Sequence, residues 1–147
     1  MLSRPQGIGS SARFDTLNSV GDAPILIAED DRDVREAIVA FLHLLGVRTV
    51  EAENGEEVLR QVREGETPCL VLLDLMMPVM DGWEVCVQMK RTEMYATIPV
   101  ILLSAHPDTV RAGARLGAAG ALRKPVDPVE LEQVVRKYCP TYSSSGQ

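Results

Sequence analysis

The stretch Leu70–Gly82, LVLLDLMMPVMDG, is the most informative segment of this 147-residue chain. It opens with an unbroken apolar run, Leu70 to Leu73, and this run ends on the carboxylate of Asp74. Such a run is typical of a strand that is buried on both faces of a parallel sheet. Ligands of open α/β sheets bind in the crevice beyond the carboxyl ends of the strands. Asp74 is therefore predicted to lie in a binding crevice.

Length and composition favour one domain with an aliphatic core. The chain is long enough for one core and short for two, and only 4% of its residues are aromatic, which suits an α/β domain better than a β-sandwich. The net charge of −6 argues against nonspecific binding to nucleic acid or to an anionic membrane. No apolar run approaches the roughly 18 residues of a spanning helix, and no secretion signal opens the chain. We expect a cytoplasmic protein.

Strand-like and helix-like patterns alternate along the chain. The predicted strands are Ile25–Ala28, Val47–Glu51, Leu70–Asp74, Ile98–Leu103 and Ala118–Leu122. The predicted helices cover 34–45, the segment after the capping residue Asn54, 83–91, 108–116 and 127–138. This alternation predicts a doubly wound, five-stranded parallel sheet of flavodoxin-like order 2-1-3-4-5 with five helices. We expect the domain to span 23–139, between a flexible leader at 1–22 and a flexible tail at 140–147.

The three cysteines, Cys69, Cys86 and Cys139, show no metal-binding spacing. Their number is odd and they are far apart in the sequence. We interpret them as small, partly buried apolar side chains in a reducing compartment. A disulfide or a zinc site is the less favoured alternative.

Residues that can act on phosphate or metal follow four of the five predicted strands. They are Glu29 and Asp30 after the first strand, Asp74 after the third, Ser104 after the fourth and Lys124 after the fifth. In a parallel sheet these ends lie at one edge, where several carboxylates repel one another. A Mg²⁺ ion removes that repulsion, and a lysine can neutralise phosphate oxygens. The set fits a carboxylate nucleophile that takes a phosphoryl group.

Each member also has an ordinary structural interpretation. Asp31 is assigned to helix capping rather than to the metal. Ser104 alone would more often be a plain loop hydroxyl, and Lys124 alone would more often be solvated. Asp74 is harder to dismiss, because a charge that closes a buried strand needs partners. The combination is far more specific than any single residue.

The chain resembles the receiver domains of two-component response regulators from roughly Pro24 to Tyr138. The resemblance rests on ILIAEDD, LVLLDLMMPVMDG, PVILLSA and the Lys124-Pro125 pair, at receiver-like spacing. The resemblance includes the single-domain architecture that is found in chemotaxis regulators. It implies that Asp74 accepts a phosphoryl group from a phosphohistidine on a sensor histidine kinase or a phosphotransfer protein.

The resemblance also implies roles for the other site residues. Glu29, Asp30, Asp74 and the carbonyl group of Met76 would hold Mg²⁺. Ser104 would bond a phosphoryl oxygen and move with the switch, Lys124 would contact the phosphoryl group, and Ala105 would leave space beside it. In this family the peptide bond before the matching proline, Pro125, is typically cis.

Receivers are not conventional enzymes, although they catalyse their own phosphorylation and dephosphorylation. The expected output is contact with a partner protein, a phosphorelay or a second copy of the chain, without nucleic acid or membrane. The expected contact surface is the face formed by residues 108–116, 118–122 and 127–138. The sequence leaves open whether this chain was cut from a larger protein.

One position departs from the receiver pattern, because Ala121 stands where receivers usually carry Tyr or Phe. Alanine has no rotamer that could swing with the switch. The alternative is therefore a constitutive receiver-like interaction module that phosphate does not switch. Met76 and His106 occupy positions that tune dephosphorylation in receivers. An apolar Met76 cannot orient an attacking water. His106 could do so, but a lone surface histidine more often has no such role, and we therefore expect a phosphoryl group that persists.

Overall fold

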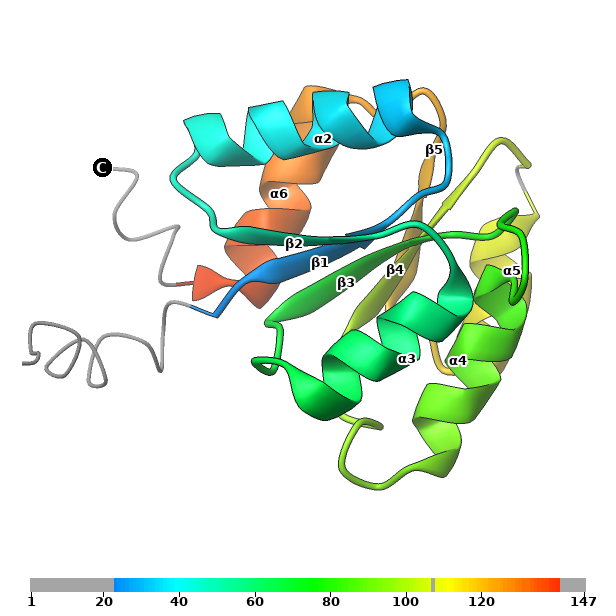
Figure 1. Ribbon diagram of the computed structural model, residues 1–147. Coiled ribbons are helices and arrows are strands. Elements are labelled where there is room, and N and C mark those ends of the chain that lie inside the picture. Colours follow the sequence, from blue (N-terminus) through cyan, green and yellow to red (C-terminus); the bar gives the residue numbers. More distant parts are fainter. Residues whose placement is uncertain (1–22, 107, 141–147) are drawn as a thin grey trace, which may run out of the picture.

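The computed structural model describes residues 23–106 and 108–140. The described part forms a parallel sheet of order β2-β1-β3-β4-β5 with helices on both faces (Figure 1). The strands are β1 (Ile25–Ala28), β2 (Thr49–Ala52), β3 (Leu70–Asp74), β4 (Val100–Ser104) and β5 (Gly120–Arg123). The helices are α2 (Arg32–Leu44), α3 (Gly55–Glu64), α4 (Gly82–Arg91), α5 (Thr109–Arg115) and α6 (Pro128–Tyr138). The predicted fold and strand order are confirmed; the leader at 1–22 and residues 141–147 of the tail lie outside the described residues.

The sheet separates two apolar cores. Alternate residues of β3 supply each one: Leu70 and Leu72 face α2 and α6, whereas Val71 and Leu73 face α3 and α4. Every residue of β3 is buried, as expected for the central strand of a sheet covered on both faces. The carboxylate of Asp74 is therefore held at the end of a fully buried central strand.

Side-chain caps start most of the helices where the sequence predicts them. Asp31 accepts hydrogen bonds from two amides of α2, and Asn54 accepts one from Glu57 in α3. Asp81 and Asp127 cap α4 and α6 in the same way. These caps agree with the predicted helix starts, and the predicted element boundaries differ from the observed ones by at most two residues. No helix in the described ranges is long and apolar enough to cross a membrane.

The interpretation of the cysteines is wrong for two of the three. Cys69 and Cys139 form a disulfide, with their α-carbons 5.7 Å apart. Cys69 lies just before β3 and Cys139 follows α6, and the packing of α6 on the sheet brings these distant positions together. A separation of 70 residues gives no local sequence signal for such a pair. Cys86 fits the prediction, since it is a buried free thiol.

Candidate functional site

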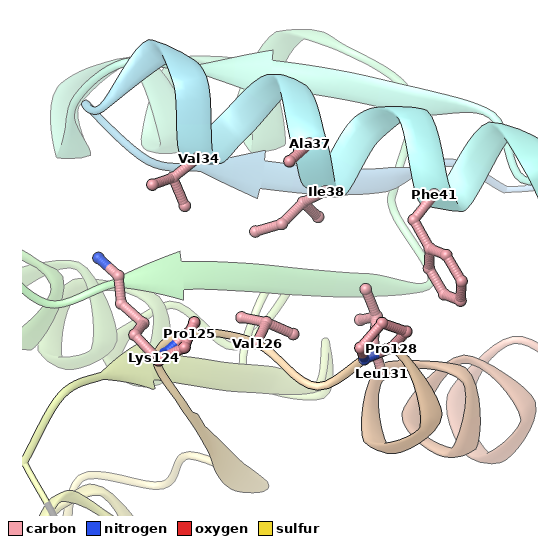
Figure 2. Close-up of a pocket in the computed structure, with 9 residues that line it drawn as sticks. All are labelled: Val34, Ala37, Ile38, Phe41, Lys124, Pro125, Val126, Pro128 and Leu131. Atoms are coloured by element: carbon pink, nitrogen blue, oxygen red, sulfur yellow. The ribbon is translucent and has the colours of Figure 1, made fainter.

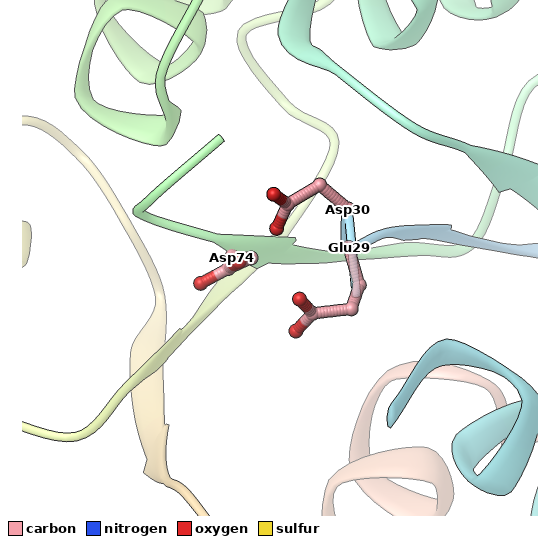
Figure 3. Close-up of side chains that lie close together, drawn as sticks. All are labelled: Glu29, Asp30 and Asp74. Carbon is pink, nitrogen blue, oxygen red and sulfur yellow. The ribbon is translucent and has the colours of Figure 1, made fainter. Parts of the chain in front are cut away.

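Three carboxylates gather at the carboxyl edge of the sheet. Glu29 and Asp30 follow β1, and Asp74 ends β3. Ala28 and Leu73 are register partners in these neighbouring strands, so the acids that follow them are brought side by side. One carboxylate oxygen from each of the three residues lies within 4.8 Å of the others (Figure 3). Glu29 and Asp74 are buried, whereas Asp30 is exposed. The cluster thus has a buried floor and one open side.

Lys124 places its ammonium group between the two buried acids. Its Nζ donates a hydrogen bond to Asp74 Oδ1 at 3.1 Å and lies 3.0 Å from Glu29 Oε1. Burial alone would lower the pKa of Lys124, but the contacts with Glu29 and Asp74 outweigh it and raise that pKa. Lys124 therefore keeps its positive charge. The Lys124-Pro125 peptide bond is cis, as the receiver resemblance implies.

Glu29 is the least satisfied polar group of the cluster. Its Oε2 accepts a hydrogen bond from the Asp31 amide at 3.1 Å. Its Oε1 forms an ion pair with Lys124 but has no hydrogen-bond partner among the described residues. Burial raises the pKa of Glu29 to about 7, although the contact with Lys124 acts in the opposite direction. A buried carboxylate oxygen whose partner is a single ammonium group can accept a further cation.

The other predicted site residues lie around this cluster. The Met76 amide donates to Asp74 Oδ1 at 3.3 Å, while the Met76 residue is 76% exposed. Ser104 ends β4 and is buried, and Ala105 and His106 beside it are exposed. The Ser104 hydroxyl makes no hydrogen bond with the acids in the described structure. It accepts hydrogen bonds from the His106 amide and from Thr109.

The loop from Asp74 to α4 contains a strained tight turn. The Met80 amide donates to the Pro78 carbonyl at 2.7 Å, and the residue between them, Val79, has a φ of 69°. This is the geometry of a γ-turn with a left-handed central residue, which is rare for a β-branched side chain. The Gly55 amide donates to the Met80 carbonyl at 3.1 Å. The start of α3 thus holds the loop that borders the carboxylates.

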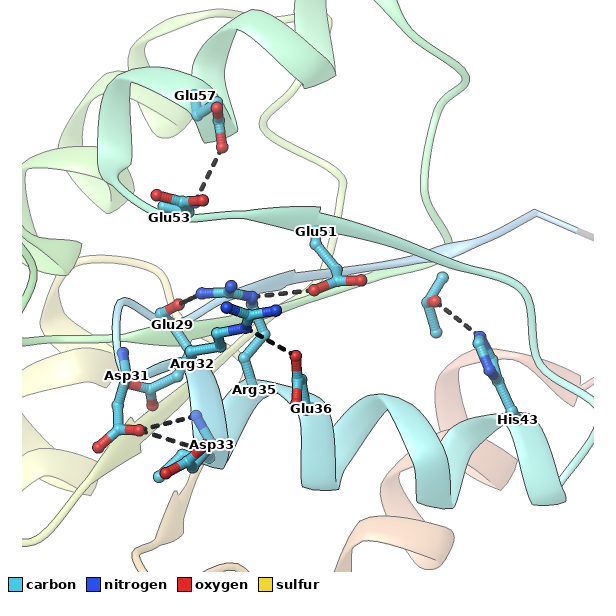
Figure 4. A network of polar contacts seen from close by, with 12 residues as sticks. Glu29, Asp31, Arg32, Asp33, Arg35, Glu36, His43, Glu51, Glu53 and Glu57 are labelled. Atoms are coloured by element: carbon cyan, nitrogen blue, oxygen red, sulfur yellow. Dashed lines mark hydrogen bonds and ion pairs between the residues drawn. The ribbon is translucent and has the colours of Figure 1, made fainter.

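Arg35, whose side chain holds the backbone of Glu29 in the cluster, was not identified from the sequence. Its guanidinium donates to the Glu29 carbonyl at 2.7 Å and to the Glu51 carboxylate at 2.9 Å (Figure 4). Arg35 is buried and lies on the same stripe of α2 as Ile38 and Leu42. That spacing of three and four residues was the available signal, because an arginine on the apolar face of a helix needs a partner. Thr109, which contacts Ser104, was also missed.

An apolar groove of about 300 Å³ opens beside Lys124 (Figure 2). The α2 side chains Val34, Ile38 and Phe41 line one wall. Val126 lines the other, between β5 and α6. The site thus combines an acidic cluster, an ammonium group and an adjacent apolar surface.

The chain matches a family model and curated relatives. The model described as a response regulator receiver domain matches residues 25–136. A probable transcriptional regulator, ycf27, of Pyropia yezoensis is 35% identical over 76% of this chain and 45% of its own length. An uncharacterized 14.6 kDa protein of Leptolyngbya boryana is 34% identical over 84% of this chain and 95% of its own length. The chain spans somewhat less than half the length of the ycf27 relatives.

Solved structures agree with this match. A putative response regulator from Chloroflexus aurantiacus superposes with a TM-score of 0.75 and 28% identity, covering 80% of this chain and 98% of its own. The receiver domain of the sensor histidine kinase PA1611 from Pseudomonas aeruginosa superposes with a TM-score of 0.72 and 25% identity, covering 80% of this chain and 98% of its own. That domain was solved with a magnesium ion coordinated in its active-site cleft.

Proposed function

The chain belongs to the response regulator receiver domain family, and we propose that it accepts a phosphoryl group on Asp74 in a Mg²⁺-dependent reaction. The donor is a phosphohistidine of a sensor histidine kinase or a phosphotransfer protein. The observation that carries the proposal is the hydrogen bond of 3.1 Å from Lys124 Nζ to the buried Asp74 carboxylate, inside a cluster of three acids. A buried carboxylate with an ammonium partner and an open side is arranged for attack on phosphorus.

The donor set fits a hard divalent cation. Glu29, Asp30 and Asp74 offer carboxylate oxygens close together, and the buried Glu29 Oε1 has no partner among the described residues besides its ion pair with Lys124. We propose that these three residues and the Met76 carbonyl oxygen hold Mg²⁺. A bound Mg²⁺ would neutralise the carboxylates and the charge on the transferred phosphoryl oxygens.

The side chains have separate roles in the transfer. An Asp74 carboxylate oxygen attacks the phosphorus, the phosphorus–nitrogen bond of the donor breaks, and the imidazole leaves with its electron pair. Lys124 moves its hydrogen bonds from the carboxylate to a phosphoryl oxygen. Ser104 donates a hydrogen bond from its hydroxyl group to another phosphoryl oxygen, and the small Ala105 leaves room for the phosphoryl group. Arg35 fixes the backbone on which Glu29 is held.

The output is proposed to be protein contact in the cytoplasm, through the face of α5, β5 and α6. Val110 on α5 and Val129 on α6 are exposed apolar side chains, which is consistent with a contact surface on these two helices. The partner is an output protein, a phosphorelay component or a second copy of the chain. Neither nucleic acid nor membrane is required.

Intact-mass measurement after incubation with acetyl phosphate and Mg²⁺ tests the proposal. The wild type should gain one phosphoryl group, which is lost when Mg²⁺ is chelated beforehand. Asp74→Asn should gain none, whereas Asp33→Asn, an exposed acid on α2 outside the cluster, should behave as the wild type. Absence of any gain in the wild type with small donors and with a phosphorylated histidine protein would contradict the proposal.

The alternative is a constitutive interaction module that phosphate does not switch. Ala121 favours it, since this partly buried residue packs against the core in place of the usual aromatic. The two functions differ in one measurement. A phosphorylated wild type whose partner binding and α5 dynamics equal those of Asp74→Asn would support the constitutive module.

A further inference from the structure

The hydroxyl group of Ser104 is held on the side of α5. It accepts a hydrogen bond of 2.7 Å from Thr109 Oγ1 and one of 3.0 Å from the His106 amide. These two bonds use both acceptor lone pairs of the hydroxyl. The Ser104–Thr109 contact thus joins the last residue of β4 to the first residue of α5.

Burial makes this contact energetically important. Ser104 is 6% exposed and Thr109 is 4% exposed, so water cannot readily replace either partner. A buried hydroxyl that loses its partner bears a desolvation cost. Asp108, which occupies the N-cap position of α5, makes no side-chain capping bond among the described residues, so the contact with Ser104 stands at a helix start without a side-chain cap.

On the neighbouring strand, position 121 offers no moving side chain that could respond to Ser104. Ala121 pairs with Leu102 of β4, and it has no side-chain torsion that could respond to a shift of Ser104. Any displacement of the Ser104 hydroxyl must therefore be passed on by a group that contacts it. Thr109 is such a group, and both residues line a pocket of about 220 Å³ together with Trp83.

We propose that Thr109 is a positioning residue that holds the Ser104 hydroxyl away from Asp74 in the unphosphorylated protein. When Ser104 moves toward Asp74 to donate to a phosphoryl oxygen, this displacement breaks its bond to Thr109 and releases the start of α5. Thr109 thereby takes over the transmission that an aromatic residue at position 121 would provide. This inference rests on the proposed function, because it needs a phosphoryl group on Asp74.

Thr109→Val tests the link, since valine has nearly the same shape but lacks the hydroxyl. The probe is beryllium fluoride with Mg²⁺, a mimic of the phosphoryl group on a carboxylate, and its binding is followed by fluorescence of Trp83, the only tryptophan in the chain. Without the bond to break, Thr109→Val should bind the probe about three- to tenfold more tightly than the wild type. Thr109→Ser keeps the hydroxyl and should stay within about twofold.

A double-mutant cycle separates this role from a purely structural one. In a Ser104→Ala background the link is already absent, so Thr109→Val should leave the affinity for beryllium fluoride unchanged. The same tightening in both backgrounds would overturn the inference. Unchanged or weaker binding by Thr109→Val in the wild-type background would also overturn it.

Hydrogen exchange on the wild type gives a second test that needs no variant. Amides of residues 109–112 should exchange faster when beryllium fluoride is bound, because the start of α5 is released. Unchanged or slower exchange there contradicts the inference even if Thr109→Val does not fold. If the wild type neither binds the probe nor is phosphorylated, the proposed function itself is contradicted. If phosphorylation is normal and Thr109→Val does not change the affinity for beryllium fluoride, only the proposed role of Thr109 is contradicted.

Discussion

The α-carbon of Gly82 lies directly against the backbone carbonyl of Asp74. A β-carbon added to Gly82 would lie 2.5 Å from the Asp74 carbonyl oxygen and 2.9 Å from the α-carbon of Leu75. Both neighbours are backbone atoms at the end of the central strand, so neither can move aside without moving the site. The close approach lets α4 begin immediately beside the carboxylate.

Gly82→Ala is therefore expected to lower the free energy of unfolding by about 1–3 kcal/mol. The displaced strand end should also slow phosphorylation of Asp74 by acetyl phosphate. Thermal unfolding and the rate of mass gain check the two effects. Gly46→Ala is the matched control: Gly46 has a φ of 84° but no atom within 4 Å of the added carbon. Gly46→Ala should lower the free energy of unfolding by about 1 kcal/mol through backbone strain and leave the phosphorylation rate unchanged. Equal behaviour of the two variants would contradict the argument.

Mg²⁺ should raise the midpoint of thermal unfolding of the wild type. A ligand that binds only the folded state stabilises it by about 2.7 kcal/mol at a concentration of 100 times its dissociation constant. Asp30→Asn removes one carboxylate from the cluster and should reduce the shift. Asp33→Asn should leave it unchanged. A shift of the same size in all three proteins would indicate general ionic stabilisation instead of a site.

Much of the site could be predicted from the sequence because local patterns determine it. The buried run before Asp74 fixes a central strand, and parallel topology then places Glu29, Asp30 and Lys124 at the same edge. The capping aspartates are equally local, since each acts within three residues of itself.

The contacts that sequence reasoning missed depend on three-dimensional packing. Cys69 and Cys139 meet only because α6 packs across the sheet. Thr109 contacts Ser104 because the start of α5 lies beside the end of β4. Each of these residues is ordinary in its own stretch of sequence, so a local pattern does not identify its partner.

Removal of the Cys69–Cys139 disulfide should destabilise the protein. Closing a loop of this length in the unfolded chain contributes about 4 kcal/mol on the chain-entropy model, so reductant or Cys69→Ser should lower the unfolding midpoint. Cys86→Ala, tested with the disulfide intact, should respond to reductant as the wild type does. Alkylation in denaturant should add one label without reduction and three after it. Three labels without reduction would contradict the pairing.

The free thiol of Cys86 should be unreactive at neutral pH. Burial raises its pKa to about 11, so the thiolate fraction at pH 8 is about a thousandth, against about a tenth at a pKa of 9. Alkylation by iodoacetamide at pH 8 should be at least about a hundredfold slower in the native protein than in denaturant. Since the folded state holds the proton more tightly, this thiol's contribution to stability is complete below pH 9 and is lost between pH 9 and 11. Rapid labelling of the native protein would show that Cys86 is accessible and ionised.

The phosphoryl group on Asp74 should be long-lived because Met76 offers no hydrogen bond to an attacking water. The Met76 amide contacts the Asp74 carboxylate, while the Met76 residue is 76% exposed. A polar side chain substituted at this position can therefore reach a water beside the phosphoryl group. Met76→Asn supplies an amide that can orient this water and should speed dephosphorylation up to about tenfold. Met94→Asn changes another exposed methionine, 79% exposed after α4, and should have no effect. The decay of the phosphorylated mass after donor removal measures each rate, and a wild type that already decays as fast as Met76→Asn would contradict the prediction.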